Sequence, residues 1–195
     1  MKFSEIEKHH LLKAWIAVSL AFSIMMSDIF SLSFIFYFVI SLFTVGLGVL
    51  LHEIGHKLVA QRYGCFAEFR ADDRMLLFAV FSAFFGFVFA APGAVFIYGH
   101  VTKEKSGKIS LAGPSANILL AAAFLSLGFL FRASSVLSSV FSYGFEINSF
   151  IALFNMIPFM NFDGAKIWRW SRAAYIAAAV ISGSFVVASQ FFYFF

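Results

Sequence analysis

The sequence predicts an all-α polytopic membrane protein with about five transmembrane helices and one re-entrant segment that combines a helix with a β-strand. Hydrophobic residues make up 62% of the chain and charged residues only 12%, whereas a soluble domain carries about 25% charged residues. The mean hydropathy is +0.90. Five apolar runs have the approximate length of a membrane span, at residues 11–26, 29–60, 109–131, 136–160 and 173–195. We expect one membrane-embedded domain over residues 1–195, with its core at residues 33–172.

The first apolar run is short, but Lys13 near its start can extend its ammonium group to the membrane surface. The run lacks a convincing small-residue cleavage site, so no cleavable signal peptide is evident. The single cysteine, Cys65, excludes an internal disulfide and a cysteine-rich zinc site, so any zinc must use histidine and carboxylate ligands. The net charge of +4 does not indicate nucleic-acid binding, since the basic residues fall in short hydrophilic connections.

The second run, residues 29–60, is too long for one straight crossing, and Gly46 and Gly48 are possible places for bending. If this span starts near Ser33, ~20 residues bring it to His52 at the far edge of the hydrocarbon core. There the chain reads His-Glu-x-x-His over residues 52–56. On a helix this spacing puts His52 and His56 on one face, where they can share a zinc ion, with Glu53 beside them as general base. Each charged group at membrane depth costs roughly 2.5–3.5 kcal/mol, and a metal site gives these side chains partners.

Basic residues set the orientation of the chain, because cytoplasmic connections of membrane proteins are enriched in Lys and Arg. The connections on the opposite side hold only Asp28 and Arg132. The basic groups are Lys2, Lys8 and Lys13; Lys57, Arg62, Arg70 and Arg74; Lys103, Lys105 and Lys108; and Lys166, Arg169 and Arg172. All of them are cytoplasmic if the N-terminus is inside, which predicts a multi-pass protein of the cell membrane with a cytoplasmic N-terminus.

The same charge rule requires residues 75–99 to enter the membrane and return, because a single crossing would place Lys103 outside. We expect a helix over residues 75–90, a break at residues 91–93 that contains Pro92, and an extended piece over residues 93–99. Non-helical backbone at membrane depth must be satisfied by protein or by a water-filled cavity. The extended piece is therefore expected beside the predicted site and not against lipid.

A catalytic zinc site usually has three protein ligands, so one more is needed. Asp163 is the candidate, because it lies at the cytoplasmic end of the fourth run, where Pro158 can break the helix and Gly164 can turn the backbone. The alternative for Asp163 is an ordinary acid in a helix-terminal turn.

Three separated stretches together resemble the site-2 protease family of intramembrane zinc metalloproteases. They are the segment at residues 51–64 around the two histidines, the Gly-x-x-x-Asn element from Gly113 to Asn117, and the Asn-x-x-Pro stretch that ends in Asp163 and Gly164. The match is closest to compact archaeal-type members, and PDZ and cystathionine-β-synthase-like domains are absent from the sequence. Asn161 and Ala165 depart from the proline and glycine that many members have there.

The resemblance implies that His52, His56 and Asp163 are zinc ligands, that Glu53 is the catalytic glutamate, and that Asn117 lies near the substrate or transition state. It also implies an intramembrane zinc endopeptidase that takes part in regulated intramembrane proteolysis. The expected partners are the lipid bilayer and a transmembrane-helix substrate that is cleaved near the cytoplasmic side. The expected reaction uses zinc as cofactor, with Glu53 activating a zinc-bound water, and Asn117 as a hydrogen-bond donor to the oxyanion.

Other interpretations stay open. The chain fits a catalytically inactive zinc-binding membrane scaffold and, less well, a metal transporter, against which Glu53 at the metalloprotease position argues. Asn117 also fits an interhelical hydrogen bond. Asn148 and Asn155 share a face of the fourth span, where they either pack against other helices or bind a substrate backbone. For His9, His10 and His100 a position at the membrane surface is expected.

Overall fold

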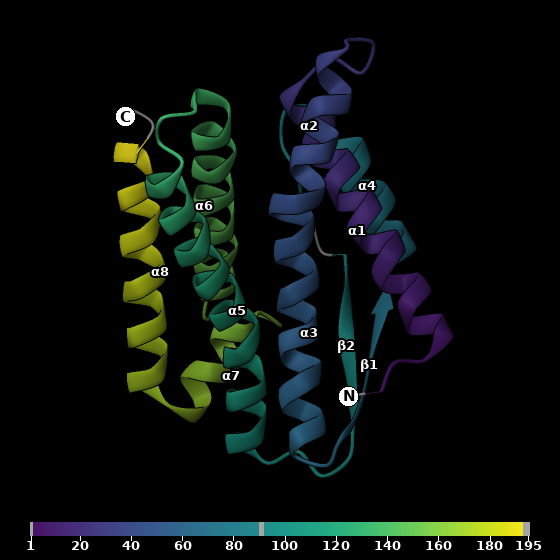
Figure 1. Ribbon diagram of the computed structural model, residues 1–195. Helices are drawn as coiled ribbons and strands as arrows, with labels where there is room; N and C mark the ends of the chain where they lie inside the picture. Colours follow the sequence, from purple (N-terminus) through teal and green to yellow (C-terminus); the bar gives the residue numbers. More distant parts are fainter. Residues whose placement is uncertain (1, 90–91, 193–195) are drawn as a thin grey trace.

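The computed structural model describes residues 2–89 and 92–192, and most of this chain forms helices that run alongside one another (Figure 1). Among the described residues, five helices are long and apolar enough to cross a membrane. They are α1 (Glu5–Met26), a continuous rod over Ser33–Arg62, α5 (Lys103–Leu130), α6 (Ser135–Asn155) and α8 (Arg172–Phe192). Each span overlaps the apolar run that predicted it, so the predicted all-α multi-pass membrane fold is confirmed.

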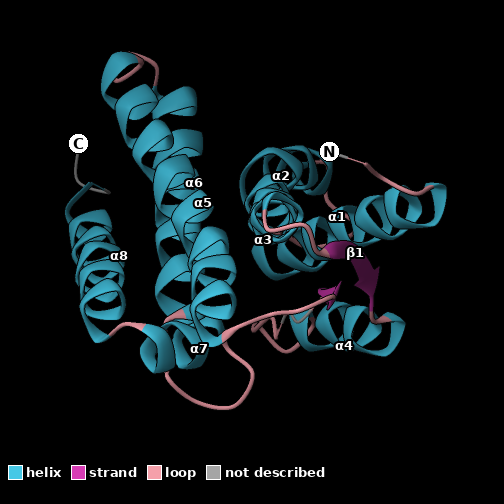
Figure 2. Ribbon diagram, turned by 90° about the horizontal axis from the view of Figure 1, so that it is seen from below, coloured by secondary structure: helices cyan, strands magenta, loops and turns pink. Residues whose placement is uncertain are grey.

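The elements fall into two groups that meet along α3 (Leu47–Arg62) and α5. Figures 1 and 2 show α5, α6 and α8 on one side, together with the short helix α7 (Asp163–Trp170), and α1, α2, α3, α4 and the strands on the other. The His-Glu-x-x-His stretch belongs to α3 and the Gly-x-x-x-Asn element to α5. The two motifs therefore lie on helices that pack against each other across the boundary between the groups.

The long second span is interrupted by a π-helical turn, Leu42–Gly46, between α2 (Ser33–Ser41) and α3. This turn includes Gly46, one of the two glycines expected to permit bending. A π-turn shifts the helical hydrogen bonds and changes which carbonyl groups are paired along the helix. The carbonyl of Leu42 accepts a hydrogen bond from the indole N–H of Trp15 on α1 at 2.8 Å. The interruption is thus stabilised by a side chain from a neighbouring span.

The segment from β1 (Phe66–Ala71) through α4 (Asp73–Ala83) to β2 (Gly93–Tyr98) leaves the end of α3 and comes back to the start of α5. The strands are antiparallel neighbours, with Phe66 opposite Tyr98 where the segment begins and ends, and Ala71 opposite Gly93 at the end next to α4. This segment therefore begins and ends at the same end of the spans (Figure 1), in agreement with the predicted return, and an extended strand follows the helix as expected.

Two details of this segment differ from the prediction. The helix ends at Ala83 and not at residue 90, because a turn follows in which Gly86 has a φ of 81°, a left-handed conformation that favours glycine and commonly ends helices. The Ser82 hydroxyl then accepts a hydrogen bond from the Phe89 amide at 3.2 Å. The sequence also gives no indication of β1, the partner of the predicted strand. The predicted break lies partly outside the described residues, since residue 91 is not among them.

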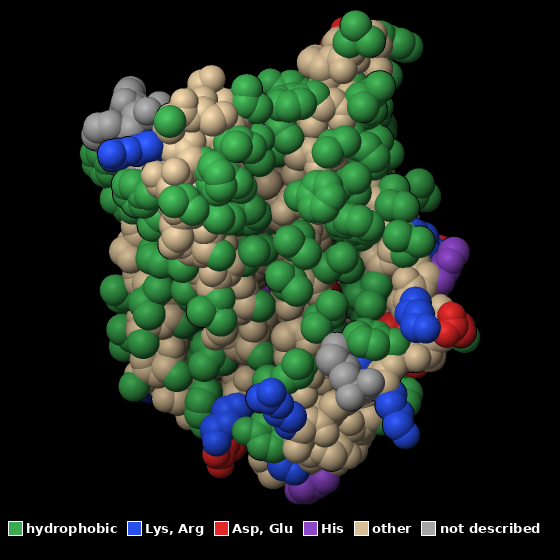
Figure 3. Space-filling view, viewed as in Figure 1, with side chains coloured by type: hydrophobic (Ala, Val, Ile, Leu, Met, Phe, Trp, Pro, Cys, Tyr) green, Lys and Arg blue, Asp and Glu red, His purple; other side chains and the backbone are tan. Residues whose placement is uncertain are grey.

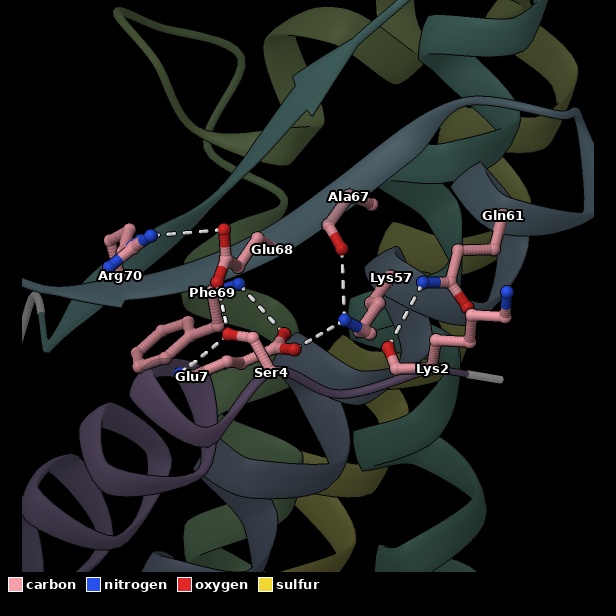
Figure 4. Close-up of polar contacts among 9 residues, drawn as sticks. All are labelled: Lys2, Ser4, Glu7, Lys57, Gln61, Ala67, Glu68, Phe69 and Arg70. Atoms are coloured by element: carbon pink, nitrogen blue, oxygen red, sulfur yellow. Dashed lines mark hydrogen bonds and ion pairs between the residues drawn. The ribbon is translucent and has the colours of Figure 1, made fainter.

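A buried ion pair joins α1, α3 and β1 (Figure 4). The ammonium group of Lys57 lies 2.5 Å from Oε2 of Glu7 and also donates to the carbonyl of Ala67 at 2.9 Å. The other oxygen of Glu7 accepts from the Phe69 amide at 2.9 Å. Glu7 and Lys57 are 0% and 2% exposed, so removal of either partner would leave an uncompensated buried charge, which typically costs about 3–5 kcal/mol. The pair therefore fixes the position of the sheet relative to α3.

Side chains close the outer edge of β1. The amide of Ala71 donates to Nδ1 of His10 at 2.9 Å, next to the contacts of Ala67 and Phe69 with the ion pair. Alternate residues of a strand direct their backbone groups to the same side, so these three residues all face away from β2. No third strand can add at this edge. On β2, the residues opposite these three are Gly93, Val95 and Ile97. Their backbone N–H and C=O groups face away from β1.

The β2 edge is open by contrast. Gly93, Val95 and Ile97 have no hydrogen-bond partner for these outward groups anywhere in residues 2–89 and 92–192. The side chains of Val95 and Ile97 pack on a cluster that includes Ala60 of α3 and Ile109 of α5. The only strand edge left available in the described sheet therefore belongs to β2, whose more buried face packs on the helices that carry the two motifs.

Charged side chains are unevenly distributed along the molecule. On the face drawn in Figure 3, Lys and Arg gather at the lower end and lower right, whereas hydrophobic side chains cover most of the rest. The lower end is where α3 ends and α5 begins in the same view (Figure 1). This separation agrees with the sequence pattern in which nearly all basic residues share one side of the spans.

Candidate metal centre

Two separate parts of the chain bring His52, His56 and Asp163 together. The histidines lie one turn apart on α3, with ring centroids 4.7 Å apart and edge-to-face. Oδ2 of Asp163 lies 3.2 Å from Nε2 of His52 and 3.0 Å from Nε2 of His56. One ligand atom from each residue lies within 4.8 Å of the others, and all three residues are buried. The structure therefore assembles the three residues that the sequence predicts as metal ligands.

Asp163 reaches this position on an element that the sequence does not predict. The fourth span ends at Asn155, earlier than expected, and Asp163 is the first residue of α7 and not part of a span. α7 is held by Ile167, which is fully buried in a cluster with Met156 and Ala178 of α8. The acid is placed by this packing, because the short helix can lie only where its apolar side finds a partner. The signal available in the sequence was the mixed stretch after Asp163, in which apolar residues such as Ile167 and Trp170 alternate with Lys166 and Arg169.

The second ring nitrogen of each histidine is paired with an oxygen atom on α5. Nδ1 of His52 lies 2.7 Å from Oδ1 of Asn117, and Nδ1 of His56 lies 2.8 Å from the carbonyl oxygen of Ile109. Carbonyl oxygens only accept hydrogen bonds, so each imidazole carries a proton on Nδ1, and Nε2 is the nitrogen that is available to a metal. Metal-binding histidines are usually held in this way. Two imidazole nitrogens and one carboxylate oxygen are the donor set of many catalytic zinc sites, so these residues fit zinc.

Gly113 explains why the two helices can approach at the site. A Cβ atom added there would lie 2.5 Å from Nε2 of His56 and 2.6 Å from Nε2 of His52. Both distances are shorter than any real carbon contact, and both involve the nitrogen atoms that would bind a metal. The glycine thus keeps free the space in front of the ligand atoms, while Asn117, one helical turn later, holds the ring of His52 from behind.

Glu53 differs from the two histidines beside it, because its side chain is not held by a hydrogen bond from the described residues. It lies between the two histidines in sequence, is partly exposed, and makes no hydrogen bond or ion pair with any residue that the structure describes. It is not a member of the metal-binding group. A carboxylate beside a metal site that is neither a ligand nor paired is chemically free to take and return a proton.

The other residues considered from the sequence lie away from this group. His9 and His100 are exposed, and His10 pairs with the end of β1. The side chain of Asn155 donates to a carbonyl of its own helix at 2.9 Å. Cys65 is buried without a disulfide. Asn148 does belong to the surroundings of the site, because it contacts Asn117. The sequence alone left its role undecided.

Comparison with known proteins identifies two relatives. No family model and no solved structure matches the chain. The chain is 45% identical over 139 residues to "Putative zinc metalloprotease MJ0611" of Methanocaldococcus jannaschii, and the match covers 70% of this chain and 73% of that protein. It is 27% identical over 165 residues to "Zinc metalloprotease MJ0392" of the same organism, which covers 84% of this chain but only 41% of the longer relative.

The close approach at Gly113 generates a prediction. Gly113→Ala should lower the zinc affinity by about 100-fold or more, because the added methyl group occupies the space in front of both Nε2 atoms, and loss of supporting contacts alone costs 10–100-fold. Competition with a chelator of known affinity measures this.

The matched control is Gly128→Ala on the same helix, where a Cβ would meet only Phe141 at an ordinary 3.7 Å. The control should bind zinc like the parent protein. Parent-like zinc affinity in Gly113→Ala would contradict the proposed position of the ion.

Proposed function

The chain belongs to the same family of zinc metalloproteases as these two relatives, and we propose that it is an intramembrane endopeptidase of the site-2 type that cleaves transmembrane helices near the cytoplasmic side of the cell membrane. One observation carries the proposal: two of the three candidate ligands, His52 and His56, lie within the span Ser33–Arg62. A soluble metalloprotease has no need to place its ligands on a membrane-spanning helix, where ionisable groups are costly. The basic residues at one end of the spans support a cytoplasmic N-terminus.

The proposed chemistry assigns a role to each side chain. Zinc, when bound, polarises the scissile carbonyl and makes water more acidic. His52, His56 and Asp163 would hold it, each through one of the atoms that already face one another, Nε2, Nε2 and Oδ2. The carboxylate of Glu53 takes a proton from the attacking water as its oxygen bonds to the carbonyl carbon, and passes that proton to the leaving amine as the C–N bond breaks. The unpaired state and partial exposure of Glu53 suit this transfer.

Asn117 takes a different place from the one expected. The sequence suggests a donor to the developing oxyanion, but Nδ2 of Asn117 already donates to the carbonyl of Gly48 and to Oδ1 of Asn148, each at 3.1 Å. Both of its N–H groups are therefore in use, and donation to an oxyanion would require one to be released. The contact that favours a role in the reaction is the one from Oδ1 to His52.

The substrate is proposed to bind by adding a strand to β2. A transmembrane helix hides its backbone carbonyls, so it must unwind before cleavage, and the unwound backbone then needs partners at membrane depth. The open β2 edge offers such groups at Gly93, Val95 and Ile97, beside α3 and the start of α5. Because side chains close the other edge of the sheet, strand addition can occur only on this side.

The proton transfer generates one prediction. Glu53→Gln should lower the cleavage rate by about 10²-fold or more while zinc content stays near that of the parent, since the amide keeps the shape but cannot accept the proton. Purified protein is incubated with membrane-helix substrates, with and without a chelator, and zinc is measured in parallel.

The control for this variant is Glu5→Gln, an exposed residue of α1 whose surface ion pair with Lys8 contributes little. Near-parent cleavage by Glu53→Gln would refute the role of general base. Zinc binding without any cleavage by the parent protein would favour the inactive scaffold, and zinc flux into proteoliposomes would favour a transporter.

Strand addition generates another prediction. Val95→Pro and Ile97→Pro should each strongly reduce cleavage of helical membrane substrates while zinc content stays near the parent value. Both residues direct their N–H groups away from β1, so proline removes a donor for the substrate without breaking the existing strand pairing.

The matched controls are Val95→Ala and Ile97→Ala, which lose similar side-chain contacts but keep the N–H group. These variants should cleave faster than the proline variants. Equal activity of the proline and alanine variants at both positions would show that the β2 edge does not bind substrate.

A further inference from the structure

A line of hydrogen bonds runs from the fourth span to the metal centre. Oδ1 of Asn148 on α6 accepts from Nδ2 of Asn117 at 3.1 Å, and Oδ1 of Asn117 lies 2.7 Å from Nδ1 of His52. Asn148 and Asn117 are both 0% exposed and His52 is 6% exposed. Because its side chain is completely buried and its amide fully engaged, Asn148 does not bind substrate, one of the two roles that the sequence leaves open.

The direction of this line is set by backbone carbonyl groups. Nδ2 of Asn148 faces two of them, Gly144 at 2.9 Å and Thr44 at 3.4 Å. Carbonyl oxygens cannot donate, so the NH₂ group of Asn148 must point toward them and its oxygen must point toward Asn117. A rotated amide would put oxygen against oxygen in a buried place, which is strongly unfavourable.

The contacts of Asn117 in turn determine which of its atoms faces His52. With the oxygen of Asn148 on one side and the carbonyl of Gly48 on the other, the NH₂ group of Asn117 has two acceptors and its own oxygen is left to face His52. The proton of the His52 ring must then be on Nδ1, which keeps the lone pair of Nε2 available for a metal.

Two features of the second span make room for this contact. Thr44 belongs to the π-helical turn Leu42–Gly46, where the hydrogen-bond pattern of the helix changes, and its carbonyl is one of the two that hold Asn148. A Cβ atom on Gly48 would collide with Oδ1 of Asn148. The span Ser33–Arg62 therefore leaves room for the side-chain amide of Asn148 to reach Asn117.

We propose that Asn148 is a positioning residue of the metal centre: it fixes the amide of Asn117 and thereby the Nδ1–H tautomer of His52. His56 provides a contrast, since its Nδ1 bonds directly to the backbone of Ile109 and needs no such relay. The inference rests on the metal site of the proposed function but not on proteolysis, so it can be tested on zinc affinity even if no substrate is cleaved.

The first measurement is the zinc affinity of Asn148→Leu, determined by chelator competition on the full-length protein in detergent or lipid. Leucine has a similar volume but offers no acceptor to Asn117. We expect affinity to fall roughly tenfold, the lower end of the effect of losing supporting contacts of a metal ligand. The second measurement is the ¹⁵N NMR spectrum of the histidine rings in the zinc-loaded protein, in which the Nδ1–H signal of His52 should shift and exchange faster with water than in the parent, while that of His56 stays unchanged.

Two further variants make the test specific. Asn155→Leu lies on the same face of α6, and its side chain bonds only to its own helix, so it should leave zinc affinity and both Nδ1–H signals unchanged. Asn148→Asp should come close to the parent in both measurements. Its neutral acid can donate to one backbone carbonyl and still accept from Asn117, and it also serves as the deciding variant if Asn148→Leu does not fold.

The proposal is overturned if Asn148→Leu keeps the parent zinc affinity and the parent Nδ1–H signal of His52. It is also overturned if Asn155→Leu weakens zinc binding as much, or if His52 and His56 change alike, because either result would mean a general loss of packing. If only Asn148→Asp folds, a changed Nδ1–H signal of His52 in that variant overturns it. Failure of the proposed peptidase activity would be seen separately, as normal zinc binding without cleavage.

Discussion

The hydrogen bonds at Nδ1 of His52 and His56 are the constraint on which the arrangement around them depends. Both acceptors, Asn117 and the carbonyl of Ile109, belong to α5, so the imidazoles are directed correctly only if α3 and α5 pack closely and in one register. Gly113 makes that packing possible by leaving space in front of the Nε2 atoms. The remaining ligand comes from outside these two helices: it is Asp163, the first residue of α7.

Among the described residues, the buried acidic and basic side chains each pair with a backbone group or with another ionisable side chain. The pair of Glu7 and Lys57 bonds to the backbone of β1 as well as to each other. The sheet is thereby fixed next to α3, and one of its edges is closed. A two-stranded sheet alone is only marginally stable, so these contacts explain how β2 can keep an open edge and remain in place beside the metal centre.

The sequence predicts those features that depend on local pattern. Apolar runs located the spans, the spacing of His52 and His56 located one face of a helix, and the basic residues required residues 75–99 to return. Features that depend on distant partners were missed. β1 is a strand because β2 and Lys57 satisfy its backbone, and six residues that include Glu68 and Arg70 carry no strong signal of their own. The position of Asn148 was equally hidden, since its partners Thr44 and Asn117 come from two other spans.

The central claim, that His52, His56 and Asp163 bind zinc between α3 and α7, is tested most directly by X-ray absorption at the zinc edge. The account predicts one zinc per chain whose nearest atoms are nitrogen and oxygen at about 2.0–2.2 Å, with the scattering pattern of two imidazole rings. A variant with His52→Ala and His56→Ala should lose that signal. A sulfur neighbour at about 2.3 Å, or a spectrum unchanged in the double variant, would contradict the account.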